Sequence, residues 1–188
     1  MAPTWPAMEY AERSKPQGSA SVRSHIAERA NISMADITPN NVGQLHMLNA
    51  KLFPIVYVKE LYKVQGEDVK PLCKLGLFND IPVGDICCTL EDGPDETTWK
   101  IYIMTLGVLP SYRRLGIATA LLNHVLENAP VGGMFAGRRV HALYLHVQTS
   151  NVAARAFYEK NGFVVSDKIE GYYSQLEPQS AWVLEKHT

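Results

Sequence analysis

Residues 101–126 read IYIMTLGVLPSYRRLGIATALLNHVL, and this stretch decides the fold. Its first half alternates β-branched and aromatic residues at a period of two, which is typical of a strand. A turn follows at Pro110, and from Ala118 the apolar positions Leu121, Leu122 and Val125 repeat at helical spacing. The stretch therefore predicts a strand, a tight corner and a helix.

The corner between this strand and this helix has the sequence RRLGIA, residues 113–118. Gly116 and Ala118 would let a ligand approach the backbone closely, and the free N–H groups of a new helix attract anionic phosphate. Arg113 and Arg114 add positive charge where a phosphate would lie. Because a glycine at a strand-to-helix turn is also common without any ligand, the corner alone leaves both interpretations open.

Composition restricts the class of protein. A chain of 188 residues suits one domain with a sizeable core and a tail, and its 46% hydrophobic and 20% charged content is that of a soluble globular protein. The net charge of −1 argues against nucleic acid or an anionic membrane as the main partner. We find no apolar run near the roughly 20 residues of a membrane helix, and no secretory signal.

The three cysteines, Cys73, Cys87 and Cys88, form no even framework and no Cys-x-x-Cys motif. Reduced thiols in a cytoplasmic or nuclear protein are the simplest explanation, and buried strand cysteines are favoured over a catalytic one. We expect no metal site.

The order of the expected elements indicates a mixed α/β fold, with early strands in hairpins and later strands joined through helices. Residues 1–30 are expected to be a flexible extension, and residues 31–188 the folded domain. Thr38 is the expected N-cap of the first helix, with Pro39 at its first position. Residues 129–139, rich in glycine, are expected to be a mobile connection. The remaining expected elements are strands at 32–37, 72–78, 81–90, from about 99, 142–148, 163–168 and 181–184, a hairpin turn at 79–80, and helices at 58–65 and 151–161.

Polar side chains of two expected strands share one face of the sheet. Alternation places Tyr144, His146 and Gln148 on one face of their strand, and Tyr102 on the corresponding face of the earlier strand. If the two strands are neighbours, Tyr102 and His146 can face one cavity. A satisfied core histidine and a buried packing tyrosine are the ordinary alternatives.

An apolar loop, FPIVY at residues 53–57, follows the first helix. Such a loop can plug the core, or it can line a pocket for an apolar side chain. The residues of the loop alone favour the plug.

Two motifs make the chain similar to the GNAT acetyltransferases, which use acetyl-coenzyme A. They are the RRLGIA corner and Asn151-x5-Phe157-Tyr158-x3-Gly162-Phe163, in the family's order and about 40 residues apart. The resemblance covers about residues 32–185. Within the family, the chain is most similar to the N-terminal acetyltransferases, and the segments that carry this likeness are FPIVY, Tyr102–Gly107, Tyr144–Gln148 and the Tyr172-Tyr173 pair. It implies the GNAT fold, a central mixed twisted sheet of about seven strands flanked by about four helices.

The resemblance also implies where the coenzyme binds. The backbone of residues 106–119 would hold its pyrophosphate, and residues 151–160 would cover its pantetheine arm. The implied coenzyme-binding residues are Leu106, Gly107, Val108, Arg113, Arg114, Leu115, Gly116, Ile117, Ala118, Thr119, Asn151, Ala154, Phe157, Tyr158 and Lys160.

The implied reaction is direct acetyl transfer in a ternary complex, without an acyl-enzyme. Tyr102 and His146 would accept a proton from the substrate's α-ammonium through ordered water, which suits an imidazole at neutral pH. Backbone N–H groups near Leu106 would polarise the thioester carbonyl. Tyr158 would be the proton donor to the leaving thiolate.

The implied substrate is a protein or nascent-chain N-terminus that begins with methionine followed by an apolar residue. Its first side chain would lie in an apolar pocket without a carboxylate, and tyrosine hydroxyls would bind its backbone. The implied substrate-binding residues are Phe53, Pro54, Ile55, Tyr57, Met104, Tyr172, Tyr173 and Leu176. Two departures from the family pattern are Ala118, in place of a second glycine, and Leu176, in place of a branched residue.

Three functions stay open at this point: acetylation of N-termini, acetylation of a lysine or small amine on the same fold, and a non-catalytic subunit of an N-terminal acetylation complex. The tyrosine pair and the Phe53-Pro54 loop argue against the small amine, and the Tyr102–His146 pair argues against an inactive subunit. The resemblance suggests association with a NatA-type complex in the cytoplasm, with no nucleic-acid or membrane partner.

Overall fold

The computed structural model describes residues 31–53 and 67–187. The expected extension at 1–30, the expected helix at 58–65 and the candidate residues Pro54, Ile55 and Tyr57 lie outside the described residues.

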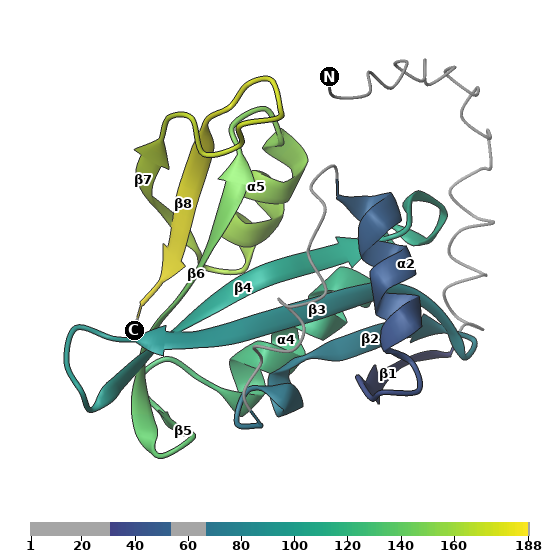
Figure 1. The fold of residues 1–188 in the computed structure, drawn as a ribbon, viewed down its shortest axis with the longest axis horizontal. Coiled ribbons are helices and arrows are strands. Elements are labelled where there is room, and N and C mark those ends of the chain that lie inside the picture. The colour runs from purple at the N-terminus through teal and green to yellow at the C-terminus, as the bar shows by residue number, and fades with distance from the viewer. Residues whose placement is uncertain (1–30, 54–66, 188) are drawn as a thin grey trace, which may run out of the picture. The chain divides into compact units, whose positions relative to one another are not determined.

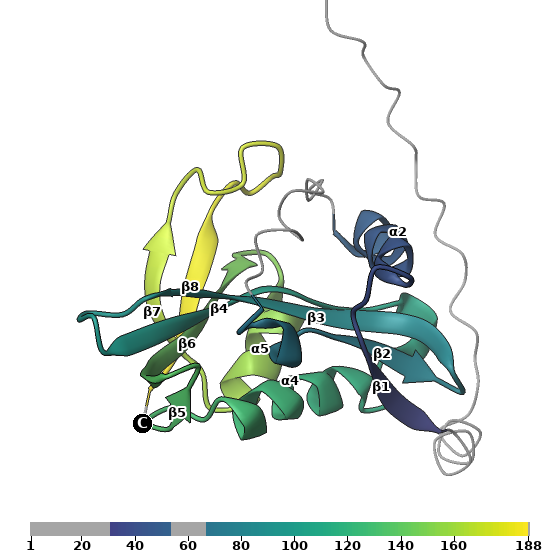
Figure 2. The same cartoon turned by 60° about the horizontal axis from the view of Figure 1, so that its bottom comes forward.

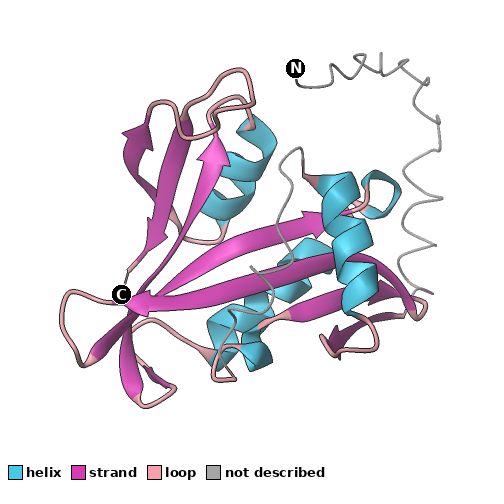
Figure 3. Ribbon diagram, in the orientation of Figure 1, coloured by secondary structure: helices cyan, strands magenta, loops and turns pink. Residues whose placement is uncertain are grey.

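One twisted sheet of eight strands forms the centre of the domain (Figures 1 and 3). Seven strands follow the order β1-β2-β3-β4-β6-β8-β7, and β5 pairs with β6 off this path. Neighbouring strands are antiparallel except for β4 and β6, which are parallel. The strands are β1 (Ile32–Asp36), β2 (Lys74–Phe78), β3 (Ile81–Asp92), β4 (Thr98–Val108), β5 (Met134–Phe135), β6 (Arg138–Gln148), β7 (Val164–Ile169) and β8 (Ala181–Lys186).

The described part of the chain contains three α-helices and two short 3-10 turns. Helix α2 (Val42–Leu52) packs on one face of β3 and β4, and α4 (Ile117–Asn128) packs on the opposite face of β2, β3 and β4 (Figure 2). Helix α5 (Val152–Lys160) follows β6, and the 3-10 turns are η1 (Lys70–Leu72) and η2 (Pro110–Tyr112). The mixed GNAT sheet flanked by helices is confirmed, with one strand more than expected because the residues before β6 add β5.

Two glycines of the sheet mark the two packed faces. A Cβ atom on Gly76 of β2 would lie 2.9 Å from Ile117 Cγ2 and 3.0 Å from Leu121 Cδ1, both on α4. A Cβ atom on Gly107 of β4 would instead lie 2.8 Å from Leu52 Cδ1 and 3.0 Å from Phe53 Cζ, at the end of α2. The absence of a side chain at each position thus lets one helix approach the sheet closely.

Two sequence-based expectations are wrong. Thr38 is not the N-cap, since α2 begins at Val42 with Asn41 as its N-cap. The Asn41 side chain turns back instead, accepting from the Thr38 N–H at 2.7 Å and donating to the Asp36 carbonyl at 2.8 Å, so it closes the β1–α2 turn. Residues 129–139 are not a bare connection, because they contain β5 and the first residues of β6.

The expected turns of the chain are confirmed. Asn79 and Asp80 join β2 to β3 with φ values of 47° and 64°, as a two-residue hairpin requires. Asn151 caps α5 by accepting from the Ala154 N–H at 3.1 Å, and Gly162 ends it with a φ of 83°. In residues 31–53 and 67–187, no helix has the length and apolar content that membrane crossing needs.

We predict that Gly76→Ala destabilises the domain. Its methyl group would enter the space of Ile117 and Leu121, both buried in the core, and overpacking of this kind costs about 1–3 kcal/mol. Gly43→Ala in α2 is the matched control, since its Cβ has no atom within 4 Å and alanine favours the helix. In urea unfolding, the midpoint concentration should be lower for Gly76→Ala than for the native protein, and equal or higher for Gly43→Ala. Equal midpoints for both variants would contradict the packing described here.

Candidate active site between two diverging strands

The candidate site opens where β4 and β6 stop pairing. Their parallel register runs from Thr98 opposite Arg139 to Tyr102 opposite Tyr144 and ends there. Beyond this point β4 continues to Val108 along β3, while β6 continues to Gln148 along β8. The two strands therefore diverge (Figure 1), and backbone groups on their facing edges become available to a ligand.

A bulge in β4 lies at the same place. Ile103 pairs with Cys88 and Thr105 pairs with the adjacent Cys87, so Met104 is an extra residue on β4. Bulges bend a strand and redirect a side chain, and they are frequent beside active sites. Here the bulge brings Met104 to the opening between the strands.

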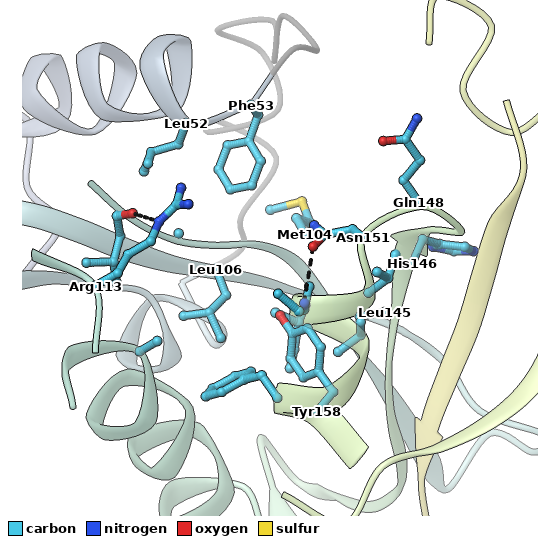
Figure 4. Close-up of a pocket in the computed structure, with 18 of the residues that line it drawn as sticks. Leu52, Phe53, Met104, Leu106, Arg113, Leu145, His146, Gln148, Asn151 and Tyr158 are labelled. Atoms are coloured by element: carbon cyan, nitrogen blue, oxygen red, sulfur yellow. Dashed lines mark hydrogen bonds between the residues drawn. The ribbon is translucent and has the colours of Figure 1, made fainter. Parts of the chain in front are cut away.

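A pocket of about 370 Å³ lies in the opening between β4 and β6. Its walls come from the end of α2, the second halves of β4 and β6, and the start of α5 (Figure 4). Of the expected site residues, it brings together Phe53, Met104, Leu106, Gly107, Val108, Arg113, Ala118, His146, Asn151, Ala154, Phe157, Tyr158, Tyr173 and Leu176.

The corner before α4 lies at the edge of this pocket, which Arg113 and Ala118 line. Gly116 is the N-cap of α4 with a φ of 91° and gives no side-chain cap, so the first N–H groups of the helix are left for another acceptor. A Cβ atom at Gly116 would meet nothing within 4 Å. Arg113 donates from Nε to the Val108 carbonyl at 2.9 Å, which fixes its guanidinium at the pocket edge (Figure 4). The corner thus combines open space with donors for an anion.

Tyr158 lies on the inner side of α5, at the bottom of the pocket (Figure 4). Its ring is buried between Phe157 and Phe163, with centroid distances of 5.2 Å and 5.5 Å in edge-on geometry. The two aromatic neighbours therefore hold its ring in one place.

Tyr102, His146 and Tyr172 form one hydrogen-bonded group beside the pocket. The Tyr102 hydroxyl lies 3.2 Å from His146 Nδ1 and 3.2 Å from the Tyr172 hydroxyl. One arrangement satisfies all three: Tyr172 donates to Tyr102, and Tyr102 donates to the imidazole. The Tyr172 ring also stacks on the imidazole, with centroids 4.2 Å apart and planes at 16°.

The environment of His146 favours a neutral imidazole. Burial lowers its pKa below the ordinary value, and the negative charge of Glu91 opposes this shift. Glu91 is held by Tyr144, whose hydroxyl donates to it and whose ring stacks on Tyr102 with centroids 4.9 Å apart. A neutral imidazole at pH 7 can accept a proton, as a general base must.

The loop after β7 is tied to β6 beside this group. The Tyr173 hydroxyl donates to the His146 carbonyl at 3.5 Å, and Gln148 Nε2 donates to the Pro178 carbonyl at 2.8 Å. Tyr173 and Leu176 thereby reach the pocket wall.

Several expected residues do not line the pocket: Tyr102, Arg114, Leu115, Gly116, Ile117, Thr119, Lys160 and Tyr172. Ile117 is buried in the core, where its side chain packs toward Gly76. Tyr102 is hydrogen-bonded to His146, which lines the pocket, and Tyr172 is hydrogen-bonded to Tyr102.

Sequence reasoning missed five lining residues: Leu52, Ile103, Leu145, Val147 and Gln148. A sixth, Ala153, was not named singly but lies in the expected segment 151–160. Leu145 and Val147 alternate with His146, so they point to the opposite face of β6, and both are buried. They reach the pocket because β6 no longer has β4 beside it, which the sequence does not show.

Comparison with known proteins identifies the class. The acetyltransferase (GNAT) family model matches residues 42–163, and the chain belongs to this family of acyltransferases. N-alpha-acetyltransferase 50 of Danio rerio is 44% identical over 158 residues, which are 84% of this chain and 89% of that protein. The probable N-acetyltransferase san of Drosophila melanogaster is 41% identical over 84% of this chain and 82% of its own length.

A solved structure agrees with these relatives. Arabidopsis thaliana Naa50 in complex with the bisubstrate analogue CoA-Ac-MVNAL matches with a TM-score of 0.73 and 39% identity, over 84% of this chain and 99% of that one. The narrowing of the resemblance to the N-terminal acetyltransferases is thereby confirmed.

The described residues fit acetyl-CoA as the acetyl donor. The uncapped start of α4 and the open space at Gly116 suit its pyrophosphate, and the gap between β4 and β6 suits its extended arm. Among the described residues, we find no group of three or more His, Cys, Asp or Glu side chains that could hold a metal ion.

We predict an acid limb in the pH profile of acetyl transfer. As the pH falls through the lowered pKa of His146, the imidazole becomes protonated and can no longer accept a proton, so kcat falls. The midpoint should lie below the ordinary histidine value of 6.5. Glu91→Gln should move it to lower pH, because the opposing charge is gone. A midpoint that His146→Gln leaves in place would exclude His146 as its source.

We predict that Gly116→Val weakens acetyl-CoA binding. A branched side chain would occupy the open space at the start of α4 and strain a residue with a φ of 91°. Gly137→Val is the matched control, since Gly137 has a φ of 79° and equally open space but lies in the turn between β5 and β6 instead of at the start of α4. Calorimetry should show weaker binding for Gly116→Val alone. Equal affinity in the two folded variants would refute this place for the pyrophosphate.

Proposed function

We propose that the protein transfers the acetyl group of acetyl-CoA to the α-amine of protein N-termini that begin with methionine. The observation that carries the proposal is the hydrogen-bonded Tyr102–His146 pair beside a mostly apolar pocket between β4 and β6. The 44% identity to N-alpha-acetyltransferase 50, and the Met-starting peptide portion of the analogue bound to Arabidopsis Naa50, support it.

In the proposed reaction the α-amine attacks the thioester carbonyl, a C–N bond forms and the C–S bond breaks. His146 and Tyr102 accept the proton that the α-ammonium must lose, through an ordered water. Backbone N–H groups near Leu106 stabilise the negative charge that develops on the carbonyl oxygen of the thioester. Tyr158, held by Phe157 and Phe163, donates a proton to the departing thiolate. The attacking nitrogen releases its second proton as the amide forms, and this proton restores the Tyr158 hydroxyl, so the products are the acetylated peptide and the free CoA thiol.

Phe53 and the loop after β7 form the proposed first-residue pocket. Phe53 lies at the end of α2 and lines the pocket together with Leu52 and Met104 (Figure 4). Tyr173 and Leu176 line the pocket from that loop. Among the described residues that line the pocket there is no Asp or Glu, which suits methionine better than a lysine side chain.

We predict that peptides starting with Met and an apolar residue exceed Ser-, Ala- or Asp-starting peptides by well over tenfold in kcat/KM. The loss of several buried methylenes from such a pocket costs this much, since each is worth about 1–3 kcal/mol. Purified full-length protein, acetyl-CoA and a peptide panel that varies residue one would measure it. Equal rates on Met and Ser peptides would end the proposal. Faster acetylation of an internal lysine or a polyamine would favour a side-chain or small-amine enzyme.

Phe53→Ala refines the same experiment. Its loss should raise KM for Met peptides more than for Ser peptides, because the methionine loses one wall of its pocket. Met47→Ala is the matched control, since Met47 lies on the same helix with an exposed side chain. A variant that loses stability but keeps its Met preference would show that Phe53 only plugs the core.

The cellular setting is part of the proposal. The buried free thiols Cys73, Cys87 and Cys88 support a cytoplasmic location, with the nucleus as a second one, because these compartments keep thiols reduced. Association with a NatA-type complex rests on the resemblance to N-terminal acetyltransferases. Within such a complex, the substrate of the protein would be the N-terminus of a nascent chain.

A further inference from the structure

A carboxylic acid lies inside the sheet near the candidate active site. Asp85 of β3 has an exposed fraction of 0%, which is unusual for an ionisable side chain. Its Oδ2 accepts a hydrogen bond from Thr105 Oγ1 of β4 at 2.8 Å, and Thr105 is buried as well. Neither residue lines the pocket.

Register places this pair below the end of α2. Asp85 is directly opposite Gly107 in the antiparallel β3–β4 pair, so the two residues face the same side of the sheet. That side is the one where a Cβ on Gly107 would meet Leu52 and Phe53. Asp85 therefore lies on the sheet face that supports the Phe53 wall of the pocket.

Thr105 interrupts a run of pocket residues. Ile103, Met104, Leu106, Gly107 and Val108 all line the pocket, and Thr105, which does not, follows the extra residue of the bulge directly. Its side chain turns to Asp85 instead. The hydrogen bond consequently joins β3 to β4 between the bulge and the segment whose backbone would contact the acetyl group.

The carboxyl group is costly at this position. Burial raises the pKa of Asp85 to about 7, against a smaller opposite effect of the Thr105 hydroxyl. Because the folded-state pKa exceeds the unfolded value, the contribution of Asp85 to stability falls as the pH rises from about 4 to about 7 and is constant above that. Strongly perturbed groups of this kind concentrate at functional sites.

We propose that Asp85 and Thr105 are positioning residues for acetyl transfer, whose hydrogen bond fixes the β4 backbone from Met104 to Gly107 in the conformation that receives the acetyl group. This inference rests on the proposed function for its reaction. It assigns neither residue a contact with substrate or coenzyme. A displacement of about 1 Å at such a segment can cost up to about a hundredfold in rate.

Paired variants of the full-length protein test the role of the hydrogen bond. Thr105→Val keeps the shape and removes the donor, whereas Thr105→Ser keeps the donor and removes a methyl group. Asp85→Ala removes the acceptor, whereas Asp85→Asn keeps an acceptor oxygen. Ile86→Val is the control for a small buried change on β3 next to Asp85. The readouts are kcat and KM with a Met peptide, and the affinities for acetyl-CoA and for CoA by calorimetry.

Thr105→Val and Asp85→Ala should each lower kcat by about tenfold or more with little change in peptide KM. They should also lose acetyl-CoA affinity relative to CoA affinity. Thr105→Ser, Asp85→Asn and Ile86→Val should stay near the native values. The double variant Asp85→Ala/Thr105→Val should be no worse than either single variant, because both remove the same bond.

Two results would overturn the positioning role. One is a native acetyl-CoA to CoA affinity ratio in folded Thr105→Val and Asp85→Ala. The other is an equal loss in Thr105→Ser and Thr105→Val, which would indicate a packing role alone. The affinity ratio needs no peptide, so it decides this inference even if the native protein acetylates no Met peptide and the proposed function fails.

Discussion

The structure depends on the end of backbone pairing between β4 and β6. Up to Tyr102 and Tyr144 the two strands share a parallel ladder, and beyond these residues each keeps a different partner. Unpaired backbone groups inside a protein are costly, so this gap is stable only if a ligand or water satisfies them. The strands β3 and β8 pair with the two sides, and residues from the end of α2, the start of α4 and α5 line the space between them. A sheet that would otherwise be continuous thereby has a binding site in its middle.

The gap also divides the chemistry of the site into two environments. Toward α2 and α5 the walls are apolar, with Phe53, Leu106 and Phe157 among them. Beside His146 the surroundings are polar and aromatic, with Tyr102, Tyr144 and Tyr172 in contact. The apolar side excludes water from a thioester, whereas the polar side can accept and release a proton. Acetyl transfer needs both environments within the length of one side chain.

Much of this architecture is visible in the sequence because it depends on local rules. Periodicity identified the strand and the helix of residues 101–126, and residue type identified Asn79-Asp80 as the β2–β3 turn and Asn151 and Gly162 as the two ends of α5. Alternation also placed Tyr102 and His146 on one face. The N-cap at Thr38 failed because the Asn41 side chain, not the Thr38 hydroxyl, closes the turn before α2. Local propensity cannot decide between two such nearby polar residues.

The features that could not be predicted depend on pairs far apart in the chain. Nothing local to β6 shows that β4 leaves it after Tyr144, so Leu145 and Val147 were not expected at the pocket. Likewise, the burial of Asp85 follows from the close approach of α2 at Gly107, which only the register reveals. Motif and resemblance placed the coenzyme at the corner before α4, where the structure leaves the first N–H groups of the helix without a side-chain cap. They did not separate backbone contacts from side-chain contacts. Ile117 was therefore named as a coenzyme-binding residue although its side chain is buried in the core.

His146 holds two attachments that are chemically independent. Its imidazole bonds to Tyr102, whereas its backbone carbonyl accepts from Tyr173 of the loop after β7. Replacement of the side chain leaves the carbonyl, and therefore leaves the anchor of that loop in place. Substitutions can consequently alter the imidazole without detaching the loop after β7, and can reshape that loop without touching the imidazole. The side chain and the backbone of one residue of β6 thus let the imidazole group and the loop wall of the pocket change independently.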